Sequence, residues 1–288
     1  CEKMLKEKII SKTIKVGILG LGYVGLPLAL LCMEKGFEVV GIDVDEKKIK
    51  AISEGKSYIS EISDSQLKAA DGKARLRTTS QLSNMSEYDI IIVCVPTPLT
   101  DGIKPDYSFL MYGIEPISHT LRKGQLIIIE STMVPQSTRN DVLPLLERSN
   151  LKVGEDFYLA FSPERIDPGN MKYQLRAIPK LVSGITDKCR DLTELFYKSL
   201  GIKTFPVQST DVAEMAKILE NTYRDVNIAL INEMAMICSD NGLNIWDVVA
   251  AAASKPFGFQ AFYPGPGVGG HCIPKDSFFY TYWAKTKG

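Results

Sequence analysis

A cysteine near the carboxyl end of the 288-residue chain has the surroundings of an activated thiol. Cys272 lies in the glycine-rich stretch 264–276, beside His271 and three residues before Lys275. A thiolate is a strong nucleophile, and positive neighbours lower the pKa of a thiol. Glycines cost backbone entropy on ordering, so this stretch indicates backbone packed closely against a ligand. We expect Cys272 to be a nucleophile; the alternative is a small buried hydrophobe.

Polar residues on a predicted long helix form a second candidate cluster. Residues 210–241 contain no Pro or Gly, which predicts a helix about 45 Å long. Lys217, Asn221 and Arg224 follow one another at spacings of four and three, so they share one helical face. Where such a face is buried, it needs a carboxylate, an oxyanion or a polar ligand as its partner. The alternative is a solvated helix face.

A glycine motif near the amino end predicts a dinucleotide site. Gly20-Leu-Gly22-Tyr-Val-Gly25 follows a predicted strand and opens a predicted helix. Gly20 permits a tight turn, Gly22 lets the backbone approach a pyrophosphate, and Gly25 lets helix and strand pack closely. The helix amino terminus offers N–H groups and a positive dipole to phosphates. We expect this turn to bind the cofactor, with Tyr23 and Val24 included; a purely structural turn is the alternative.

An acidic residue at the end of the next predicted strand indicates which dinucleotide binds. Asp43 follows the strand 37–42, close to the ~20-residue spacing of the dinucleotide fingerprint. Its carboxylate would accept hydrogen bonds from the adenosine ribose and repel a 2′-phosphate. The next residue is Val44 and not an arginine. The sequence therefore predicts NAD, in preference to NADP.

Polar residues also follow three later strands. Ligands of open α/β sheets bind outside the carboxyl ends of the strands, so these segments are expected to border the cofactor. Glu164 and Arg165 follow the strand 157–161 and would place a carboxylate near the reactive end of the cofactor. The alternative is a plain surface pair, or ordinary turn chemistry. The expected cofactor contacts after the other two strands are Val95, Pro96, Thr97, Ser131 and Thr132.

The order of the predicted elements favours an α/β fold. Apolar runs at 15–19, 37–42, 89–95, 125–130 and 157–161 read as strands, and helical patterns alternate with them. Such alternation predicts a Rossmann-like, doubly wound parallel sheet, followed here by a long helix and a small helical domain. We expect an NAD-binding domain at 13–207 and a helical domain at 208–288, which carries the cysteine loop and forms a dimer.

Composition excludes several other classes of protein. Lys and Arg together number 34, and Asp and Glu together also number 34, so the net charge is zero. This balance argues against binding nucleic acid through bulk positive charge. No apolar run approaches the ~18 residues of a membrane helix, and the amino terminus lacks the apolar segment of a signal peptide. Six cysteines without a CxxC pair and only two histidines favour free thiols in the cytoplasm and no metal site.

A thiolate beside NAD suggests a two-step oxidation of an alcohol. The first hydride transfer yields an aldehyde, which must become tetrahedral again before it loses a second hydride. Addition of the thiolate achieves this as a thiohemiacetal. The second hydride transfer leaves a thioester, which water cleaves to an acid.

Six ordered motifs resemble those of the nucleotide-sugar 6-dehydrogenases, which include UDP-glucose and UDP-N-acetylhexosamine dehydrogenases. They span nearly the whole chain: KVGILGLGYVGLPLA, VPTP, STMVP, FSPER, AKILENTYRDVNIALINE and PGVGGHCIPKD. The resemblance implies oxidation of a sugar C6 alcohol to a carboxylate with two NAD per turnover. It also implies a homodimer through the long helix.

The resemblance implies roles at the positions that match the motifs. Cys272 is similar to the thiol nucleophile, and Lys217 and Asn221 resemble the pair that stabilises the oxyanion on the thiohemiacetal. Asp276 and Thr132 match residues associated with a proton-relaying water.

Further roles concern the two ligands. Glu164 matches the acid beside nicotinamide and substrate, and Lys275 resembles a cofactor-side lysine. The expected substrate contacts are Glu164, Arg165, Lys217, Asn221, Tyr263 and Gly267.

The string SPERIDPGN is similar to the N-acetylhexosamine branch of the family. This implies UDP-N-acetylglucosamine as the first candidate substrate and UDP-N-acetylmannosamine as the second, with UDP-glucose as the alternative. The implied role is in surface polysaccharide biosynthesis. The resemblance implies that family members continue past the position of Gly288 into a second nucleotide-binding-like domain, which holds part of the UDP. We therefore expect this polypeptide alone to bind NAD but to turn over poorly.

Two other interpretations stay open from the sequence. One is a single-step NAD-dependent hydroxyacid dehydrogenase, in which Lys217 and Asn221 polarise the alcohol and Cys272 takes no part. The other is an NAD-binding or assembly module without enzymatic activity.

Overall fold

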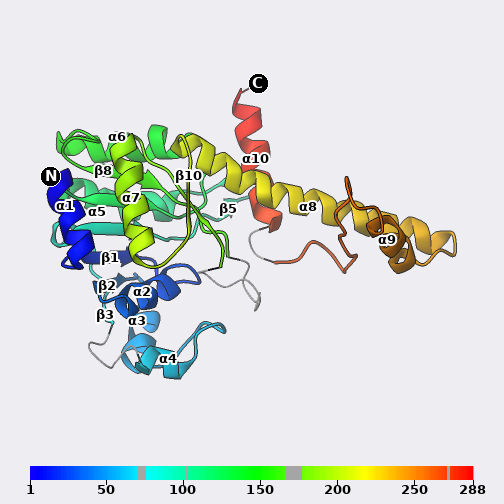
Figure 1. Cartoon of the computed structure of the whole chain (residues 1–288), viewed down its shortest axis with the longest axis horizontal. Helices are drawn as coiled ribbons and strands as arrows, with labels where there is room; N and C mark the ends of the chain where they lie inside the picture. Colours follow the sequence, from blue (N-terminus) through cyan, green and yellow to red (C-terminus); the bar gives the residue numbers. More distant parts are fainter. Residues whose placement is uncertain (70–75, 102, 167–176, 271–272, 288) are drawn as a thin grey trace. The chain divides into compact units, whose positions relative to one another are not determined.

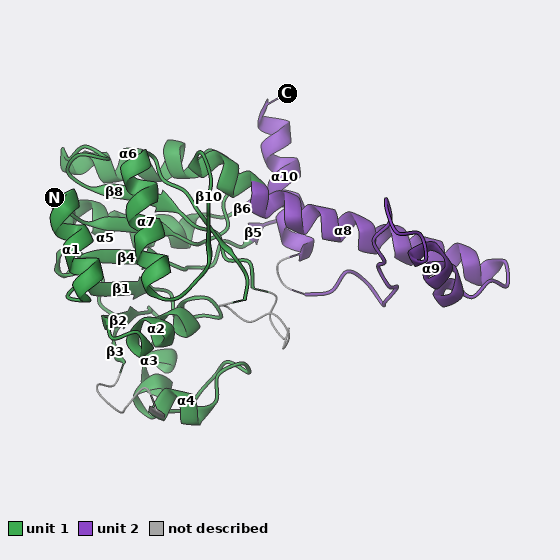
Figure 2. Ribbon diagram, viewed as in Figure 1, with its two compact units in different colours: residues 1–98, 106–215 green, residues 99–105, 216–288 purple. Residues whose placement is uncertain are grey.

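The computed structural model describes residues 1–69, 76–101, 103–166, 177–270 and 273–287 (Figure 1). The chain divides into two compact units, which are coloured separately in Figure 2. The first unit comprises Cys1–Pro98 and Asp106–Met215, and the second comprises Leu99–Pro105 and Ala216–Gly288.

A six-stranded parallel sheet forms the centre of the first unit. The strands lie in the order β3, β2, β1, β4, β7 and β8, and each pairs in parallel with its neighbours. This is the strand order of a doubly wound nucleotide-binding fold, and it confirms the predicted fold class. The bounds are β1 Lys15–Leu19, β2 Glu38–Ile42, β3 Arg77–Thr79, β4 Ile90–Val93, β7 Leu126–Ile129 and β8 Tyr158–Phe161.

Helices cover both faces of this sheet, which is why the strands read as continuous apolar runs. Every residue of β4, β7 and β8 is buried. Ile18 and Ile92 belong to the core on one face, and Ile91 and Ile127 to the core on the other. The packed helices are α1 Glu2–Ser11, α2 Gly25–Glu34 and α7 Asp187–Ser199 on the first face, and α5 Ser108–Thr120 and α6 Leu143–Leu146 on the second.

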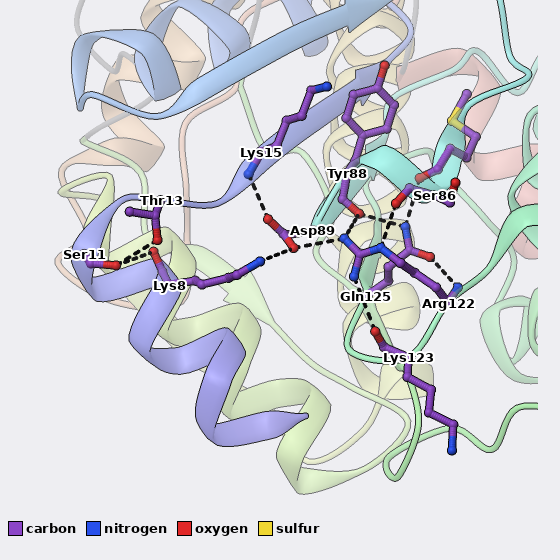
Figure 3. A network of polar contacts seen from close by, with 11 residues as sticks. Lys8, Ser11, Thr13, Lys15, Ser86, Tyr88, Asp89, Arg122, Lys123 and Gln125 are labelled. Carbon is purple, nitrogen blue, oxygen red and sulfur yellow. Dashed lines mark hydrogen bonds and ion pairs between the residues drawn. The ribbon is translucent and has the colours of Figure 1, made fainter.

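One carboxylate fixes the amino-terminal helix to the sheet (Figure 3). Asp89 accepts a hydrogen bond from the backbone N–H of Lys15 at 3.1 Å. It also pairs with Lys8 Nζ and with Arg122 Nη2, each at 3.0 Å. Burial opposes the charge, but these donors outweigh it and hold the pKa of Asp89 below its usual value. The charged segment 1–12 is therefore part of the folded unit, which the sequence pattern did not indicate.

Smaller elements complete the first unit. The short parallel pair β9 Lys180–Val182 and β10 Thr204–Pro206 flanks α7 in the chain. The segment 136–149 is not one continuous helix: a π-helical turn, Thr138–Val142, precedes α6, and a 3₁₀ turn, Glu147–Ser149, follows it. Pro144 lacks the N–H that a helix running through from residue 136 would use, and it lies in the first turn of α6, where no such N–H is needed. The remaining segments are α3 Glu46–Ser53, α4 Asp64–Ala69 and the 3₁₀ turn Met85–Glu87.

The second unit consists mainly of helices. The long helix α8, Thr210–Asp240, has 31 residues, and its residues 210–215 belong to the first unit. α9 (Ile245–Ala253) and α10 (Ile273–Lys287) follow, and a hairpin joins β5 (Leu99–Thr100) to β6 (Lys104–Pro105). None of the described helices is both long and apolar enough to cross a membrane.

Candidate active site

The turn after β1 has the backbone geometry that a pyrophosphate site requires. Gly20 has φ +92°, and a Cβ there would lie 2.6 Å from the carbonyl oxygen of Cys94. Gly25 begins α2, and a Cβ there would lie 1.8 Å from the carbonyl oxygen of Gly20. A Cβ on Gly22 would meet nothing within 4 Å, so this part of the turn is open. No side chain caps α2, and Tyr23 is 59% exposed beside the half-buried Val24.

The expected ribose ligand, Asp43, is held in place by the protein. It follows β2 and is 5% exposed. Asp43 Oδ2 accepts from the Leu21 N–H at 2.8 Å and from Lys48 Nζ at 2.9 Å, and Oδ1 accepts from the Asp45 N–H at 2.9 Å. A carboxylate has about four acceptor positions, so the carboxylate can accept a ribose hydroxyl through Oδ1 without losing these donors. Lys48 is a polar partner that sequence reasoning did not assign to Asp43.

Hydroxyl groups tie together the ends of β4 and β7. Thr97, 2% exposed, donates from Oγ1 to the carbonyl oxygen of Thr132 at 2.8 Å. Ser131 Oγ donates to the carbonyl oxygen of Val95 at 2.7 Å. These bonds explain the residue types after both strands, because they fix two loops at the carboxyl edge of the sheet, where cofactors bind. The predicted contact Pro96 is exposed.

A buried ionic cluster lies at the same edge, and sequence reasoning found only one of its members. Glu164, two residues after the serine that follows β8, shares the ammonium of Lys180 with Glu130. Arg165 donates from Nη1 to the carbonyl oxygen of Pro179 at 2.7 Å. Tyr197 O–H donates to Glu130. A glutamate directly after the apolar strand β7 was the available signal for Glu130.

Burial and charge act in opposite directions in this cluster. Burial raises the pKa of Glu130, and the nearby ammonium of Lys180 reduces that effect without cancelling it. Burial disfavours the ammonium of Lys180, but the carboxylates of Glu130 and Glu164 outweigh it and raise the pKa of Lys180. Lys180 is therefore a cation within the first unit.

In the second unit, two residues predicted to act in catalysis are in contact. Asn221, half-buried on α8, donates from Nδ2 to Asp276 Oδ2 at 2.6 Å. Asp276 lies in the first turn of α10 and is fully buried. Lys217 is half-buried one turn before Asn221, whereas Arg224 is exposed. Of the polar face of α8, Asn221 thus has a carboxylate of α10 as its partner, as expected for a buried polar residue.

Residues before the cysteine loop are held to the helices of the second unit. Tyr263 stacks on Trp246 of α9, with ring centroids 5.9 Å apart. The Gly265 N–H donates to Asn232 Oδ1 of α8 at 2.9 Å. Gly267 is exposed, and a Cβ on it would meet nothing within 4 Å. This segment thus combines exposed backbone at Gly267 with a stacked aromatic pair that includes Tyr263, four residues earlier in the chain.

The predicted nucleophile lies next to this arrangement in the chain. Cys272 and His271 fall outside the described residues. α10 begins at the following residue, Ile273, and Lys275 Nζ lies 5.4 Å from the centroid of the Phe279 ring. Within the described ranges, no group of three or more His, Cys, Asp or Glu residues has the arrangement of a metal site.

Comparisons with known proteins give the same assignment for both parts of the chain. Residues 14–201 match the NAD binding domain of the UDP-glucose/GDP-mannose dehydrogenase family, and residues 211–288 match the central domain of that family. The first match confirms NAD as the predicted cofactor.

Individual relatives are similar over nearly all of the chain. UDP-N-acetyl-D-glucosamine 6-dehydrogenase of Pseudomonas aeruginosa is 39% identical over 279 residues, which is 96% of this chain and 65% of the relative. UDP-N-acetyl-D-mannosamine dehydrogenase of Pyrococcus horikoshii is 36% identical, over 94% of this chain and 65% of the relative. A solved structure of UDP-D-ManNAc dehydrogenase from Pyrococcus horikoshii superposes with a TM-score of 0.85 at 37% identity, covering 92% of this chain and 63% of that one.

The chain thus spans slightly less than two thirds of the length of these relatives. One family accounts for the order of the two matched domains, for the strand order of the sheet and for the glycine turn. The protein belongs to the UDP-glucose/GDP-mannose dehydrogenase family.

Proposed function

We propose that this chain carries the NAD-binding and catalytic parts of a nucleotide-sugar 6-dehydrogenase. The reaction is oxidation of the C6 alcohol of a UDP-N-acetylhexosamine to the uronic acid. The observation that carries the proposal is the contact of Asn221 with the buried Asp276, four residues after Cys272. UDP-N-acetylglucosamine is the first candidate substrate and UDP-N-acetylmannosamine the second, since two similar relatives act on these sugars.

The open glycine turn and Asp43 fit the pyrophosphate and ribose of NAD, which when bound accepts the hydride in each oxidation step. Glu164 takes part in the proton transfers at the sugar alcohol. The Cys272 thiolate adds to the aldehyde carbon, and the carbonyl oxygen becomes an oxyanion. Lys217 and the Asn221 amide donate hydrogen bonds to that oxyanion.

The second oxidation leaves a thioester on Cys272, and water must then attack it. Asp276 and Thr132 position that water and relay its proton. Attack breaks the carbon–sulfur bond, releases the acid and returns the thiol. The proposal divides the chain into an NAD-binding domain at 13–207 and a central domain at 208–288. Cytoplasmic location and surface polysaccharide synthesis stay predictions from the sequence.

A screen of UDP-sugars tests this function. Each sugar is incubated with NAD and with the protein in stoichiometric amount, so that slow turnover still gives a measurable product. We expect NADH and a uronic acid from a UDP-N-acetylhexosamine, with UDP-glucose tested alongside. Cys272→Ala should form no acid, whereas the control Cys238→Ala, which removes a buried thiol of α8, should retain acid formation. Acid formation by Cys272→Ala at the unsubstituted rate would contradict the proposed role of the thiol.

A further inference from the structure

One buried lysine connects two acidic residues near the carboxyl ends of two strands. Glu130 directly follows β7, Glu164 follows β8, and Lys180 begins β9. Lys180 Nζ lies 2.9 Å from Glu130 Oε2 and 3.2 Å from Glu164 Oε2. The side chains are 0% exposed for Glu130, 5% for Lys180 and 14% for Glu164. Glu164 is therefore the most exposed member of the three.

The carboxylate of Glu164 is held at both of its oxygens. Oε1 accepts from the backbone N–H groups of Arg165 and Ile166, each at 2.7 Å. Oε2 accepts from the ammonium of Lys180. Because different donors hold the two oxygens, the carboxylate cannot turn about its terminal bond without breaking a charge-assisted contact. Lys180 supplies the only one of these contacts that comes from a distant part of the chain, since the other two come from the adjacent backbone.

Charge balance alone does not account for the contact between Lys180 and Glu164. A buried ammonium needs one paired carboxylate, and Glu130 provides it at the shorter distance. Glu130 is in turn fixed by the hydroxyl of Tyr197, whose ring also lies 5.2 Å from Lys180 Nζ. Glu130 and Tyr197 thus contact the Lys180 ammonium from the buried side. The remaining hydrogen-bonding capacity of this ammonium is directed to Glu164.

We infer that Lys180 is a positioning residue for the reaction: it holds Glu164 in its working orientation, while Glu130 and Tyr197 fix Lys180 from the buried side. This inference rests on the proposed function, in which Glu164 takes part in proton transfer. A positioning error of about 1 Å can cost a hundredfold in rate, so loss of this hold is expected to lower the rate of acid formation far more than the affinity for NAD.

The test separates positioning from simple charge balance. Lys180→Met alone would leave Glu130 as a buried, unpaired carboxylate and would destabilise the fold. The informative variant is therefore Lys180→Met combined with Glu130→Gln, which removes both buried charges and leaves Glu164 in place. Lys180→Arg, which keeps a cation, is the conservative control. Measurements are kcat and KM for NAD, together with amide hydrogen exchange at Arg165 and Ile166.

We expect the double variant to fold and to bind NAD within about twofold of the unsubstituted protein, while kcat for acid formation falls at least about tenfold. Exchange at the two amides should accelerate. Lys180→Arg should recover most of the rate.

Two results would overturn the inference. One is a double variant with unchanged kcat and amide exchange, which would reduce the role of Lys180 to charge balance for Glu130. The other is a double variant that fails to fold, which would make Lys180 part of the structural core. Absence of NADH formation by the unsubstituted protein with every UDP-sugar would instead contradict the proposed function, and the amide exchange would still report on the hold over Glu164.

Discussion

At the scale of single residues, the candidate site depends on side chains that the protein itself holds in position. Asp43 has three donors before any cofactor is considered: the Leu21 and Asp45 amides and the Lys48 ammonium. A carboxylate fixed in this way loses little conformational freedom when a ribose binds. Recognition of the ribose should therefore depend on the charge and the acceptor geometry of this one side chain.

Asp43→Asn should weaken NAD binding and reduce its preference over NADP. The amide keeps one acceptor oxygen but loses the negative charge that repels a 2′-phosphate. We expect the Kd for NAD to rise about tenfold, roughly 1.4 kcal/mol, and the Kd for NADP to change less or to fall. Isothermal titration of the 288-residue chain measures both constants. Glu46→Gln, an exposed acid three residues further on, is the control, and equal losses for the two dinucleotides would contradict this role.

Single residues were predictable where their signal is local. The glycine turn and Asp43 stand in a fixed spacing because a strand, a turn and a helix follow one another directly in the chain. Lys180 and Tyr197 lie 50 and 67 positions after Glu130, so their contacts depend on how β7, β9 and α7 pack. No spacing in the sequence encodes such a cluster. The predicted roles of Cys272 and of the other site residues stay predictions.

At the scale of elements, a buried glutamate fixes the start of the long helix to the loop after β7. Glu214 on α8 is fully buried and accepts from the Gln136 N–H at 2.6 Å, from the Thr138 N–H at 2.8 Å and from Thr138 Oγ1 at 2.6 Å. Gln136 has φ +79°, a left-handed backbone that costs energy for a residue other than glycine. The hydrogen bond to Glu214 compensates part of that cost.

Burial raises the pKa of Glu214 to about 7, and its three hydrogen bonds only partly oppose the shift. An acid with a raised pKa binds an extra proton in the folded state, so its contribution to stability falls as pH rises from about 4.5 to 7. Glu214→Gln should remove this pH dependence. It should also lower the free energy of unfolding by about 1–3 kcal/mol, because the new amide donor faces a backbone N–H.

Thermal or urea unfolding at pH 5, 6 and 7.5 measures the effect. The difference between the two proteins should shrink as pH rises through this range. Glu233→Gln, an exposed substitution on the same helix, should follow the unsubstituted protein at each pH. A constant difference from pH 5 to pH 7.5 would contradict the shifted titration of Glu214.

The elements themselves were largely predictable because their signals are periodic and short-range. Five strands of the main sheet and the long helix follow from apolar runs and from the absence of Pro and Gly. In the segment 136–149, Pro144 marks the point where a regular helix cannot continue, and the structure has a break there. The sequence pattern does not indicate helix α1, because its two core residues, Leu5 and Ile9, stand among many charged residues. Their burial follows only from how the helix packs on the core.

At the scale of the whole molecule, an apolar stripe on α8 predicts association of two copies. Leu219, Val226, Leu230 and Ile237 repeat at spacings of seven, four and seven, so they lie on one face of the helix. Each is between 55% and 64% exposed in the single chain. A continuous apolar stripe of this kind is self-complementary across a two-fold axis, which favours a second copy of the same helix as its partner.

Leu230→Glu should therefore shift the protein from dimer to monomer. Burying a carboxylate against an apolar helix without a partner costs several kcal/mol, on the order of 2–5. Sedimentation equilibrium across a concentration series measures the dissociation constant. Ser239→Glu, exposed on the opposite side of α8, should leave the dimer intact, and a monomeric unsubstituted protein would refute the assignment.

In the proposed reaction, one sugar carbon loses two hydrides in succession, and Cys272 holds the intermediate. The amount of NADH formed per molecule of UDP-sugar consumed, taken from absorbance and from mass spectrometry of the same reaction, tests this sequence of steps. Two NADH per sugar are expected, with the uronic acid as the product. One NADH per sugar, with an aldehyde or ketone as the product, would contradict the two-step oxidation and would favour a single-step dehydrogenase.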